Sequence, residues 1–418
     1  MARLVVFEDR GWRSLRPLTD LLPVPALAFG ASDVARRWLR AAGLRLFAIE
    51  ARPLAMAAWH DAPVPDTSSV DPSEDAVVVN AAALPGAWAA ALLAEGGPAL
   101  LLAGDRVAGA RLPLRLAVPA LGKGERFEEI LLSLGLPAQP VEAKFLRYPW
   151  QLMEANPGAI ADDLASARGG VRGQVHRLAC LETPERIVVG DGAVVGPYAV
   201  LDAGPGPILV GRGARIAAHT VVTGPCVIGP GTQLLGGFVS GTTFGPECRV
   251  AGEVEASVWQ GYGNKRHHGF VGHSLIGEWV NLGALTTTSD LKNNYGPVRV
   301  WVDGAEVDSG SSKVGALVGA HAKTGIGTLL PTGASIGVGA NLFGGGRFSP
   351  KRVASFAWWD GEHDAVHEFE KFLATARIAM SRRGRTLGPA DEALLRGVFA
   401  TTAGERVPRS LTPRATAP

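Results

Sequence analysis

The sequence predicts a mixed α/β plus all-β protein: an N-terminal α/β domain, then a left-handed parallel β-helix, then a short helical C-terminal tail. Three observations predict this architecture. Short apolar runs alternate with Ala/Leu/Arg-rich stretches up to about residue 150, a six-residue repeat fills most of 186–349, and the repeat is lost after residue 350. A chain of 418 residues is long enough for two or three domains.

The first domain, placed at residues 1–150, is predicted from apolar runs separated by helical stretches. Alternating strands and helices indicate an α/β layer. Ser32 or Asp33 is a suitable N-cap for the first helix, because a side-chain oxygen there accepts a hydrogen bond from the first turn. The expected strands are 4–7, 44–49 and 76–79, the expected helices are 32–42 and 87–94, and the expected loop is 63–75.

A helical linker is expected over 151–185, and the chain then changes to a period of six residues. Units such as VGDGAV, VGPYAV and IGPGTQ begin with an aliphatic residue followed by a small one, and the period resumes after residue 313. Repetition at a short fixed period is typical of a stacked solenoid. Six residues per side and three sides per turn describe a left-handed parallel β-helix over 186–349, with the opening aliphatic residues pointing inward. These regular aliphatic positions disfavour a flexible Gly-rich segment.

The tail, residues 350–418, is expected to be helical and to pack on the end of the solenoid. Its apolar side chains recur at helical spacing. They are Val366, Phe369, Phe372 and Leu373. Residues after 406 are expected to be disordered.

Composition excludes several classes of protein. A net charge of +2, with no basic run interleaved with aromatic residues, argues against a nucleic-acid binder. No run of about 18 apolar residues occurs, so no membrane span is expected. The apolar run 4–7 ends at once in Glu8, Asp9 and Arg10, which indicates a first strand and not a signal peptide. Three cysteines without a CxxC pair fit a reducing cytoplasm.

The stretch 263–296 interrupts the repeat with residues that can do chemistry. His267 and His268 follow Lys265 and Arg266 in an insertion between two repeat blocks. A neutral imidazole can take a proton from an attacking amine near pH 7, and the alternative is a plain surface histidine. The residues expected to contact a substrate are Asn281, Asn294, Tyr295, Lys265 and Arg299. For Asn281 a structural asparagine ladder is the equal alternative.

A rival chemistry starts from His219, His268 and His273. Trimeric solenoids resembling gamma-class carbonic anhydrases bind a metal through three histidines. Histidine is a common zinc ligand, and a catalytic zinc keeps one coordination position open. The sequence therefore leaves a metal-dependent hydration enzyme as an alternative.

Several motifs together resemble a named family. NKRHHGFVGHSLIGEWVNLGA followed by SDLKNNYGPVRV is the most specific, and LRPLTDLLPV, VVVNAAALP and RYPWQLMEAN extend the similarity over nearly the whole chain. The chain resembles the alternative bacterial family of the bifunctional UDP-N-acetylglucosamine pyrophosphorylase/glucosamine-1-phosphate N-acetyltransferase. The resemblance implies a homotrimer with active sites between subunits, in which acetyl-CoA is the co-substrate.

The same resemblance implies roles for individual residues. His267 matches the base that acts on the sugar amine. Asn294 and Tyr295 match the pair that contacts the amino sugar, and Asn281 matches an asparagine of the preceding coil. Ala284 and Ala320 fall where backbone groups line the acetyl-CoA cleft. The family's phosphate-binding lysine, about twelve residues before the histidine, is absent, and Glu253 and Glu255 stand in that neighbourhood.

The first domain resembles a diminished nucleotidyltransferase domain. FEDRGWRSLRPLTD replaces the usual Gly-rich triphosphate loop. Arg13 and Arg16 remain as candidates for nucleotide contacts, and Asp105 remains as a candidate ligand for Mg²⁺. UTP would be the second substrate.

The expected function is acetyl transfer from acetyl-CoA to the amine of a sugar phosphate, first of all glucosamine-1-phosphate, in UDP-N-acetylglucosamine biosynthesis. A nucleotidyltransferase activity of the N-terminal domain would accompany it. Two alternatives stay open: the metal enzyme described above, and a non-catalytic sugar-nucleotide binding protein on a trimeric scaffold. No nucleic-acid or membrane partner is expected.

Overall fold

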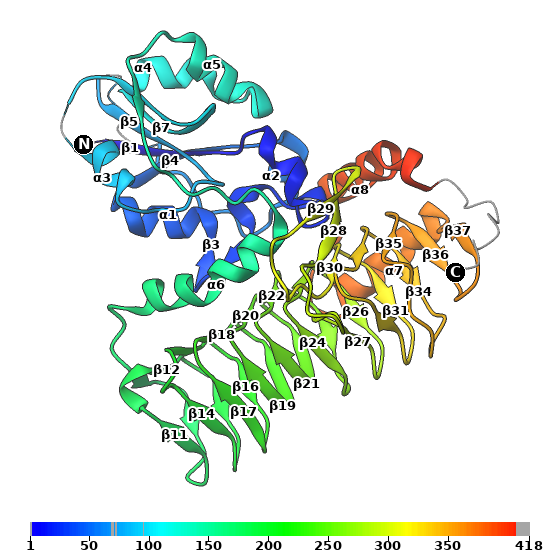
Figure 1. The fold of residues 1–418 in the computed structure, drawn as a ribbon. Helices are drawn as coiled ribbons and strands as arrows, with labels where there is room; N and C mark the ends of the chain where they lie inside the picture. Colours follow the sequence, from blue (N-terminus) through cyan, green and yellow to red (C-terminus); the bar gives the residue numbers. More distant parts are fainter. Residues whose placement is uncertain (1, 68–70, 72, 95, 407–418) are drawn as a thin grey trace.

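The computed structural model describes residues 2–67, 71, 73–94 and 96–406. An α/β domain lies along one side of a long β-solenoid, and two helices close the far end of the solenoid (Figure 1). This arrangement confirms the predicted fold class. The predicted disorder after residue 406 lies outside the described residues.

The first domain is built on a six-stranded sheet in the order β4-β1-β5-β7-β6-β8. Strands β4, β1 and β5 are parallel, and β7 runs antiparallel to both β5 and β6. Alternate residues of β1 enter two different cores, Leu4 and Val6 on one face and Val5 and Phe7 on the other. A strand buried on both faces has apolar residues at successive positions, and this is the continuous apolar run that predicted β1. The bounds are β1 Arg3–Phe7, β4 Arg45–Glu50, β5 Asp75–Asn80, β6 Ala99–Ala103, β7 Arg106–Pro113 and β8 Ala138–Pro140.

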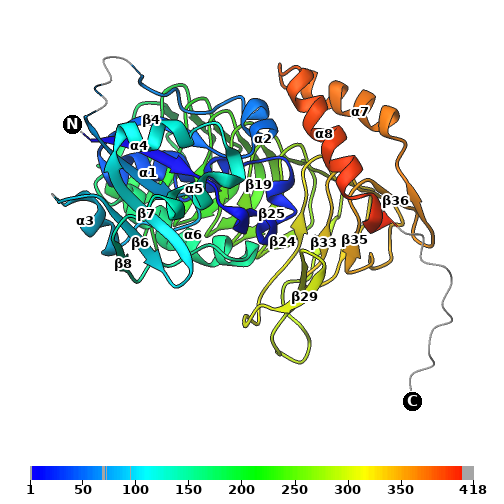
Figure 2. The same ribbon diagram turned by 90° about the horizontal axis from the view of Figure 1, so that it is seen from above.

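Short helices cover the two faces of this sheet (Figure 2). The helices are α1 Val34–Ala42, α2 Pro53–Ala58, α3 Trp88–Leu93, α4 Leu114–Ala117 and α5 Phe127–Ser133. A small hairpin of β2 (Ala28–Phe29) and β3 (Ser32–Asp33) precedes α1. The turn η1 (Arg10–Leu15) follows β1 directly.

The N-cap of α1 is Asp33, one of the two predicted residues, and its carboxylate accepts a hydrogen bond from the backbone N–H of Arg36 at 2.7 Å. Asp33→Ala is expected to lower the free energy of unfolding by about 1 kcal/mol, because a backbone donor of the first turn loses its partner. Urea unfolding followed by circular dichroism measures this change. Ser32→Ala is the matched control, and an equal loss in that variant would contradict the assignment of the cap.

The solenoid consists of parallel strands that stack coil upon coil. A single inward row shows how the repeat builds the core. The row runs through residues paired in register: Val189, Val210, Ile228, Phe244, Trp259, Ile276, Val318, Ile336 and Val353. All of them are buried. The predicted inward position of the opening aliphatic residues is therefore confirmed.

The strands of the solenoid fall into one large sheet, a ten-stranded sheet and the short pair β27–β32. The bounds in the first half are β12 Ile187–Val189, β13 Val194–Val195, β14 Val200–Asp202, β15 Ile208–Val210, β16 Arg215–Ile216, β17 Thr220–Thr223, β18 Cys226–Ile228, β19 Gln233–Ser240, β20 Thr243–Phe244, β21 Arg249–Glu255 and β22 Val258–Trp259. Those in the second half are β23 Asn264–Lys265, β24 Phe270–Gly272, β25 Leu275–Ile276, β26 Asn281–Leu282, β27 Thr287–Thr288, β30 Leu317–Val318, β31 Lys323–Thr324, β32 Leu329–Leu330, β33 Ser335–Ile336 and β34 Asn341–Leu342.

The strand pairing of the solenoid extends beyond 186–349 at both ends. The helix α6 covers Pro149–Leu164 only, so the expected helical linker is too long. Residues 170–182 already form β9 (Gly170–Val171), β10 (Gln174–Val175) and β11 (Cys180–Glu182), which pair with the next coil. At the other end β35 (Arg352–Val353) and β36 (Ala357–Trp359) continue the stack. Pairing needs only backbone groups, so these coils form without the repeat.

The tail contains a short strand and two helices: β37 (Asp364–Val366), α7 (Phe369–Ser381) and α8 (Pro389–Thr401). Phe372 and Leu373 of α7 pack with Phe356 in a buried cluster at the solenoid end. Val366 belongs to β37 instead of the predicted helix and is exposed. No helix in the part of the chain that the structure describes is long and apolar enough to cross a membrane.

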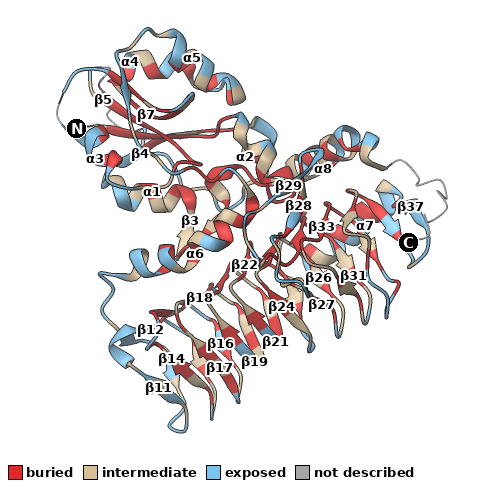
Figure 3. Cartoon of the chain, viewed as in Figure 1, coloured by how far each residue is buried: buried red, intermediate tan, exposed pale blue. Residues whose placement is uncertain are grey.

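The α/β domain and the solenoid share one hydrophobic core. Leu275 and Leu317 of the solenoid belong to the same buried cluster as Leu4 and Val6 of the first domain, and α6 lies against β18, β22 and β25. Figure 3 shows buried residues on both sides of this contact. Hydrogen bonds also cross it: Thr243 Oγ1 donates to Gly30 O at 2.9 Å, and Gln260 Oε1 accepts from Ala28 N at 2.7 Å.

Candidate functional site

The loop between β23 and β24 projects His267 from a corner of the solenoid. Arg266, His267 and His268 are all exposed. Gly269 has a φ of +132°, and a Cβ there would lie 2.2 Å from Thr286 O, so only glycine fits the end of this loop. The loop therefore exposes the His267 imidazole, while the end of the loop at Gly269 is closely packed.

Lys265 lies directly under this loop and is fully buried. Its Nζ donates to Ala251 O at 2.7 Å and to His267 O at 2.9 Å. Burial lowers the pKa of this amine to about 8. The side chain thus points into the solenoid, so the expectation that Lys265 contacts the substrate is corrected. The sequence carried a signal for this: Lys265 pairs in register with Val250, an inward position of the repeat.

Asn281 lies in a ladder of polar residues on one side of the solenoid. It pairs in register with Asn264 on one side and with Lys323 on the other. Its Oδ1 accepts a hydrogen bond from Asn264 Nδ2 at 2.7 Å. The half-buried side chain therefore has a structural partner, while its other lone pair and its amide group stay available to a ligand.

Asn294, Tyr295 and Arg299 belong to the segment 291–313, which leaves the solenoid after Asp290 and returns at Val314. This segment contains the hairpin of β28 (Arg299–Val302) and β29 (Ala305–Asp308). Tyr295 is 74% exposed. Arg299 pairs with Glu306 at 3.4 Å. Within the described part of the chain, no hydrogen bond or ion pair joins these side chains to His267.

Ala284 and Ala320 lie at different corners of the solenoid. Ala284 follows β26, whereas Ala320 precedes β31, the strand that pairs with β26. Their carbonyls accept hydrogen bonds along two separate stacks, Ala284 O from Gly327 N at 2.8 Å and Ala320 O from Gly339 N at 2.9 Å. A single chain therefore does not bring both residues to one cleft.

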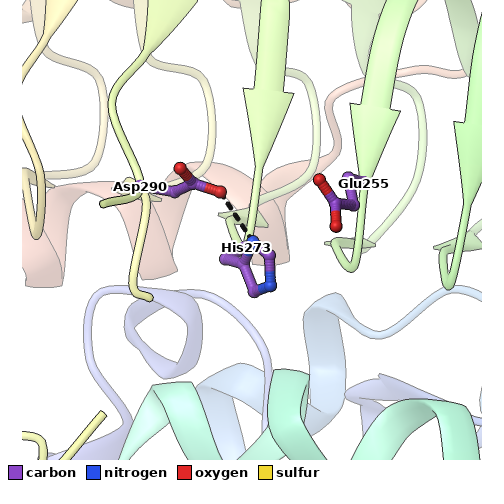
Figure 4. Close-up of side chains that lie close together, drawn as sticks. All are labelled: Glu255, His273 and Asp290. Carbon is purple, nitrogen blue, oxygen red and sulfur yellow. Dashed lines mark hydrogen bonds and ion pairs between the residues drawn. The ribbon is translucent and has the colours of Figure 1, made fainter. Parts of the chain in front are cut away.

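The three histidines of the rival metal site do not meet within the chain. His219 stacks on Tyr198 with ring centroids 5.3 Å apart, and His268 is exposed in the His267 loop. Among the described residues, the one group that could hold a metal ion is Glu255, His273 and Asp290 (Figure 4). The motifs of the sequence did not indicate that Glu255 and Asp290 lie beside His273. Their spacing from His273 is close to one coil, which was the available signal.

The carboxyl edge of the first domain's sheet is filled by paired charges. In open α/β sheets this edge is where ligands bind. Asp9, directly after β1, accepts from Asn80 Nδ2 at 2.8 Å and pairs with Arg106 at 2.7 Å. Its neighbour Glu8 pairs with Arg52 at 2.8 Å. The two carboxylates, the amide and the two guanidinium groups named here therefore have partners within the chain.

A second layer closes the same edge. The Arg52 guanidinium lies 3.8 Å from the centroid of the Trp12 ring, and Trp12 Nε1 donates to Glu125 Oε1 at 2.6 Å. Glu50, at the end of β4, accepts hydrogen bonds from the backbone N–H groups of Gly122 and Gly124. Burial raises the pKa of the Glu50 carboxyl.

The residues predicted to contact a nucleotide are not brought together. Arg13 pairs with Glu125 at 3.1 Å. Arg16 pairs with Asp20 at 2.6 Å and with Glu405 of the C-terminal segment at 2.9 Å, on the side that faces the solenoid. Asp105 is exposed in the turn between β6 and β7, next to the carboxyl edge, and belongs to no metal-binding group of the described residues.

Comparisons with known proteins give one family match and several curated relatives that cover parts of the chain. Residues 4–170 match the family model described as sugar nucleotidyl transferase. A bifunctional sugar-1-phosphate nucleotidylyltransferase/acetyltransferase of Sulfurisphaera tokodaii is 38% identical over 22% of this chain and 23% of its own length. The bifunctional protein GlmU of Xylella fastidiosa (strain M12) is 31% identical over 44% of this chain and 42% of its own length. The chain thus spans less than half the length of either relative.

A solved UDP-N-acetylglucosamine acyltransferase from Campylobacter jejuni is 14% identical, with 55% of this chain and 94% of that chain covered and a TM-score of 0.27. The family match and the curated relatives, by contrast, agree with the resemblance that the sequence motifs indicated. Residues 4–170 are therefore similar to the sugar nucleotidyl transferase family, and parts of the chain are similar to the GlmU-like bifunctional sugar-1-phosphate nucleotidylyltransferase/acetyltransferases.

Proposed function

We propose that the solenoid transfers an acetyl group from acetyl-CoA to the amine of a sugar phosphate, with glucosamine-1-phosphate as the first acceptor to test. The observation that carries the proposal is the exposed His267 on a tightly packed loop of the β-helix. The relatives' printed names, which include acetyltransferase, support it.

The proposed reaction has a simple proton balance. The acceptor nitrogen attacks the thioester carbonyl and forms a C–N bond, and His267 takes the proton that this nitrogen loses. The C–S bond then breaks, and the departing coenzyme A thiolate takes that proton from His267. A base of this kind contributes about 100- to 10,000-fold to the rate. Backbone N–H groups in a cleft between two copies, to which Ala284 and Ala320 would contribute from different chains, would stabilise the oxyanion, which is a large contribution in acyl transfer.

The substrate residues support a homotrimer as the active form. Asn294, Tyr295 and Arg299 are exposed and unconnected to His267 within one chain, so a neighbouring copy would complete the site. Exposed apolar side chains on the coils from Leu285 onward favour association with another copy. They are Leu285, Ile326, Phe343 and Phe348. Asn281 is proposed to orient the sugar through its free amide hydrogens.

For the first domain we propose nucleotidyl transfer with UTP and Mg²⁺ as the second activity, supported by the family match over 4–170. A triphosphate at the carboxyl edge has to compete with the Asp9–Arg106 and Glu8–Arg52 pairs. Arg13 is the proposed nucleotide contact nearest this edge, and Asp105 is the proposed metal ligand in the adjacent turn. Arg16, which faces the solenoid, keeps this role only if its ion pairs with Asp20, Asp303 and Glu405 open.

The experiment is a thiol-release assay with acetyl-CoA and a panel of amino sugars. Release that depends on glucosamine-1-phosphate is expected, and a separate assay of pyrophosphate release with UTP reports on the first domain. Absence of release with every acceptor, from protein shown by light scattering to be a folded trimer, would overturn the proposal. Release only with an unphosphorylated amino sugar would keep the mechanism and replace the acceptor.

A further inference from the structure

We propose that Glu255, His273 and Asp290 bind one divalent metal ion of the zinc or manganese class. The three residues offer one imidazole nitrogen and two carboxylate oxygens, and these ligand atoms all lie within 4.8 Å of one another. Ligands of a single ion at about 2.0–2.2 Å from the metal lie at comparable separations. Figure 4 shows that the three side chains converge from neighbouring coils.

The backbone holds these residues in place. Glu255 is the last residue of β21, and His273 and Asp290 follow β24 and β27 in the next two coils. His273 N donates a hydrogen bond to Glu255 O at 2.9 Å, and the backbone at Asp290 is held by a hydrogen bond that its carbonyl accepts from Val314 N at 2.9 Å. His273 has a φ of +44°, a conformation that a residue with a side chain adopts only when its surroundings impose it. A site on such rigid elements needs little rearrangement to bind an ion.

The glycine beside His273 makes room for the third ligand. A Cβ at Gly272 would lie 2.6 Å from Asp290 Oδ2 and 2.2 Å from Cζ of Phe270. Any other residue at 272 would therefore displace the Asp290 carboxylate from its place next to His273. Glycine at 272 therefore leaves space both for the Phe270 ring and for the Asp290 carboxylate.

The chemistry of the cluster suits a dication. His273 Nδ1 and Asp290 Oδ2 face each other at 2.7 Å, so an ion bound by both atoms would take the place of the proton that now lies between them. The cationic partner beside Glu255 is Lys313, 3.9 Å away and 44% exposed. Two carboxylates against one exposed lysine leave a net negative charge. Mixed oxygen and nitrogen ligands favour zinc, manganese or iron over magnesium or calcium.

Three protein ligands leave at least one coordination position for water or for a bound molecule. Glu255 also lines a groove on the β17–β19–β21 face, together with Phe238, Ser240 and Glu253. The ion would therefore lie at one end of this groove. This proposal does not depend on acetyl transfer, because it concerns metal binding itself, and its ligand set differs from the three-histidine set of the sequence analysis.

The test is direct metal binding by the full-length chain after removal of metals with a chelator. Isothermal titration with Zn²⁺ and with Mn²⁺ is expected to give one ion per chain, and Co²⁺ is expected to develop a visible absorption band. His273→Ala should weaken the affinity at least about tenfold. His268→Ala, which removes an exposed imidazole of the neighbouring loop, is the matched control and should bind as the unchanged protein does.

A thermal unfolding measurement shows whether each variant is folded and whether the ion stabilises it. Added Zn²⁺ should raise the melting temperature of the unchanged chain and of His268→Ala, because the ion binds the folded state. It should not do so for Glu255→Gln, which changes only a half-exposed side chain. Absence of binding by the unchanged chain would overturn the proposal. So would binding by His273→Ala and Glu255→Gln with the same affinity as the unchanged chain, whatever the acetyl-transfer assay shows.

Discussion

His267→Ala is expected to lower the rate of acetyl transfer at least about tenfold and to leave the fold intact. The side chain is exposed and no hydrogen bond of the described residues involves its ring, so its removal costs no packing. The loss would come from the transition state, where the attacking amine no longer has a base. Because binding is untouched, kcat should fall while KM for acetyl-CoA stays the same.

The control for this experiment stands next to it in the chain. His268 is exposed in the same loop, so His268→Ala removes a similar ring from a similar place. Acetyl transfer by His268→Ala should remain near normal. The pH profile gives an independent check, since the limb that reports the base should disappear in His267→Ala only. Near-normal turnover of His267→Ala would exclude this histidine as the base.

The second large effect concerns stability at alkaline pH and arises from Lys265. Burial lowers the pKa of this amine from 10.5 to about 8 in the folded chain. Between these two values the unfolded chain binds more protons than the folded one, so the free energy of unfolding rises with pH. The charged amine therefore costs stability below pH 8, and the cost is removed as the pH approaches 10.5. A shift of this size corresponds to about 3 kcal/mol.

Lys265→Met is expected to abolish this rise. Urea unfolding of both proteins at pH 7.5 and pH 10 gives the difference, and the unchanged chain should gain about 3 kcal/mol more than the variant. Burial also lowers the pKa of Lys323 to about 8, but that contribution is present in both proteins and cancels. Lys371→Met removes an exposed lysine and serves as the control. Parallel pH dependences of Lys265→Met and the unchanged chain would contradict the prediction.

The repeat made the solenoid predictable because each coil obeys the same local rule. An aliphatic residue at the start of each unit has to leave water, and stacking on the equivalent residue of the next coil is how it does so. The row from Val189 to Val353 follows that rule, except that the aromatic residues Phe244 and Trp259 fill the inward position in two coils. The rule does not predict where the solenoid begins and ends. Strands β9 and β36 join the stack through backbone hydrogen bonds, which do not depend on the side-chain repeat.

The candidate site was predictable only in part. His267 and its exposed loop follow from the break in the repeat, whereas the burial of Lys265 depends on the register of β23 against β21. The predicted residues Arg13 and Arg16 have their charges engaged by Glu125, Asp20 and Glu405. Two of these partners are more than a hundred residues away along the chain, so no local motif reveals them.

The sequence by itself determined the period of the solenoid, the α/β character of the first domain and the place of the histidine loop, because each depends on neighbouring residues. Only the tertiary structure decided which charges meet. Glu255, His273 and Asp290 come together because coils of nearly equal length place equivalent corners above one another. Asp9 and Arg106 pair because the ends of β1 and β7 reach the same edge of one sheet. Such contacts depend on the path of the whole chain, which local patterns do not contain.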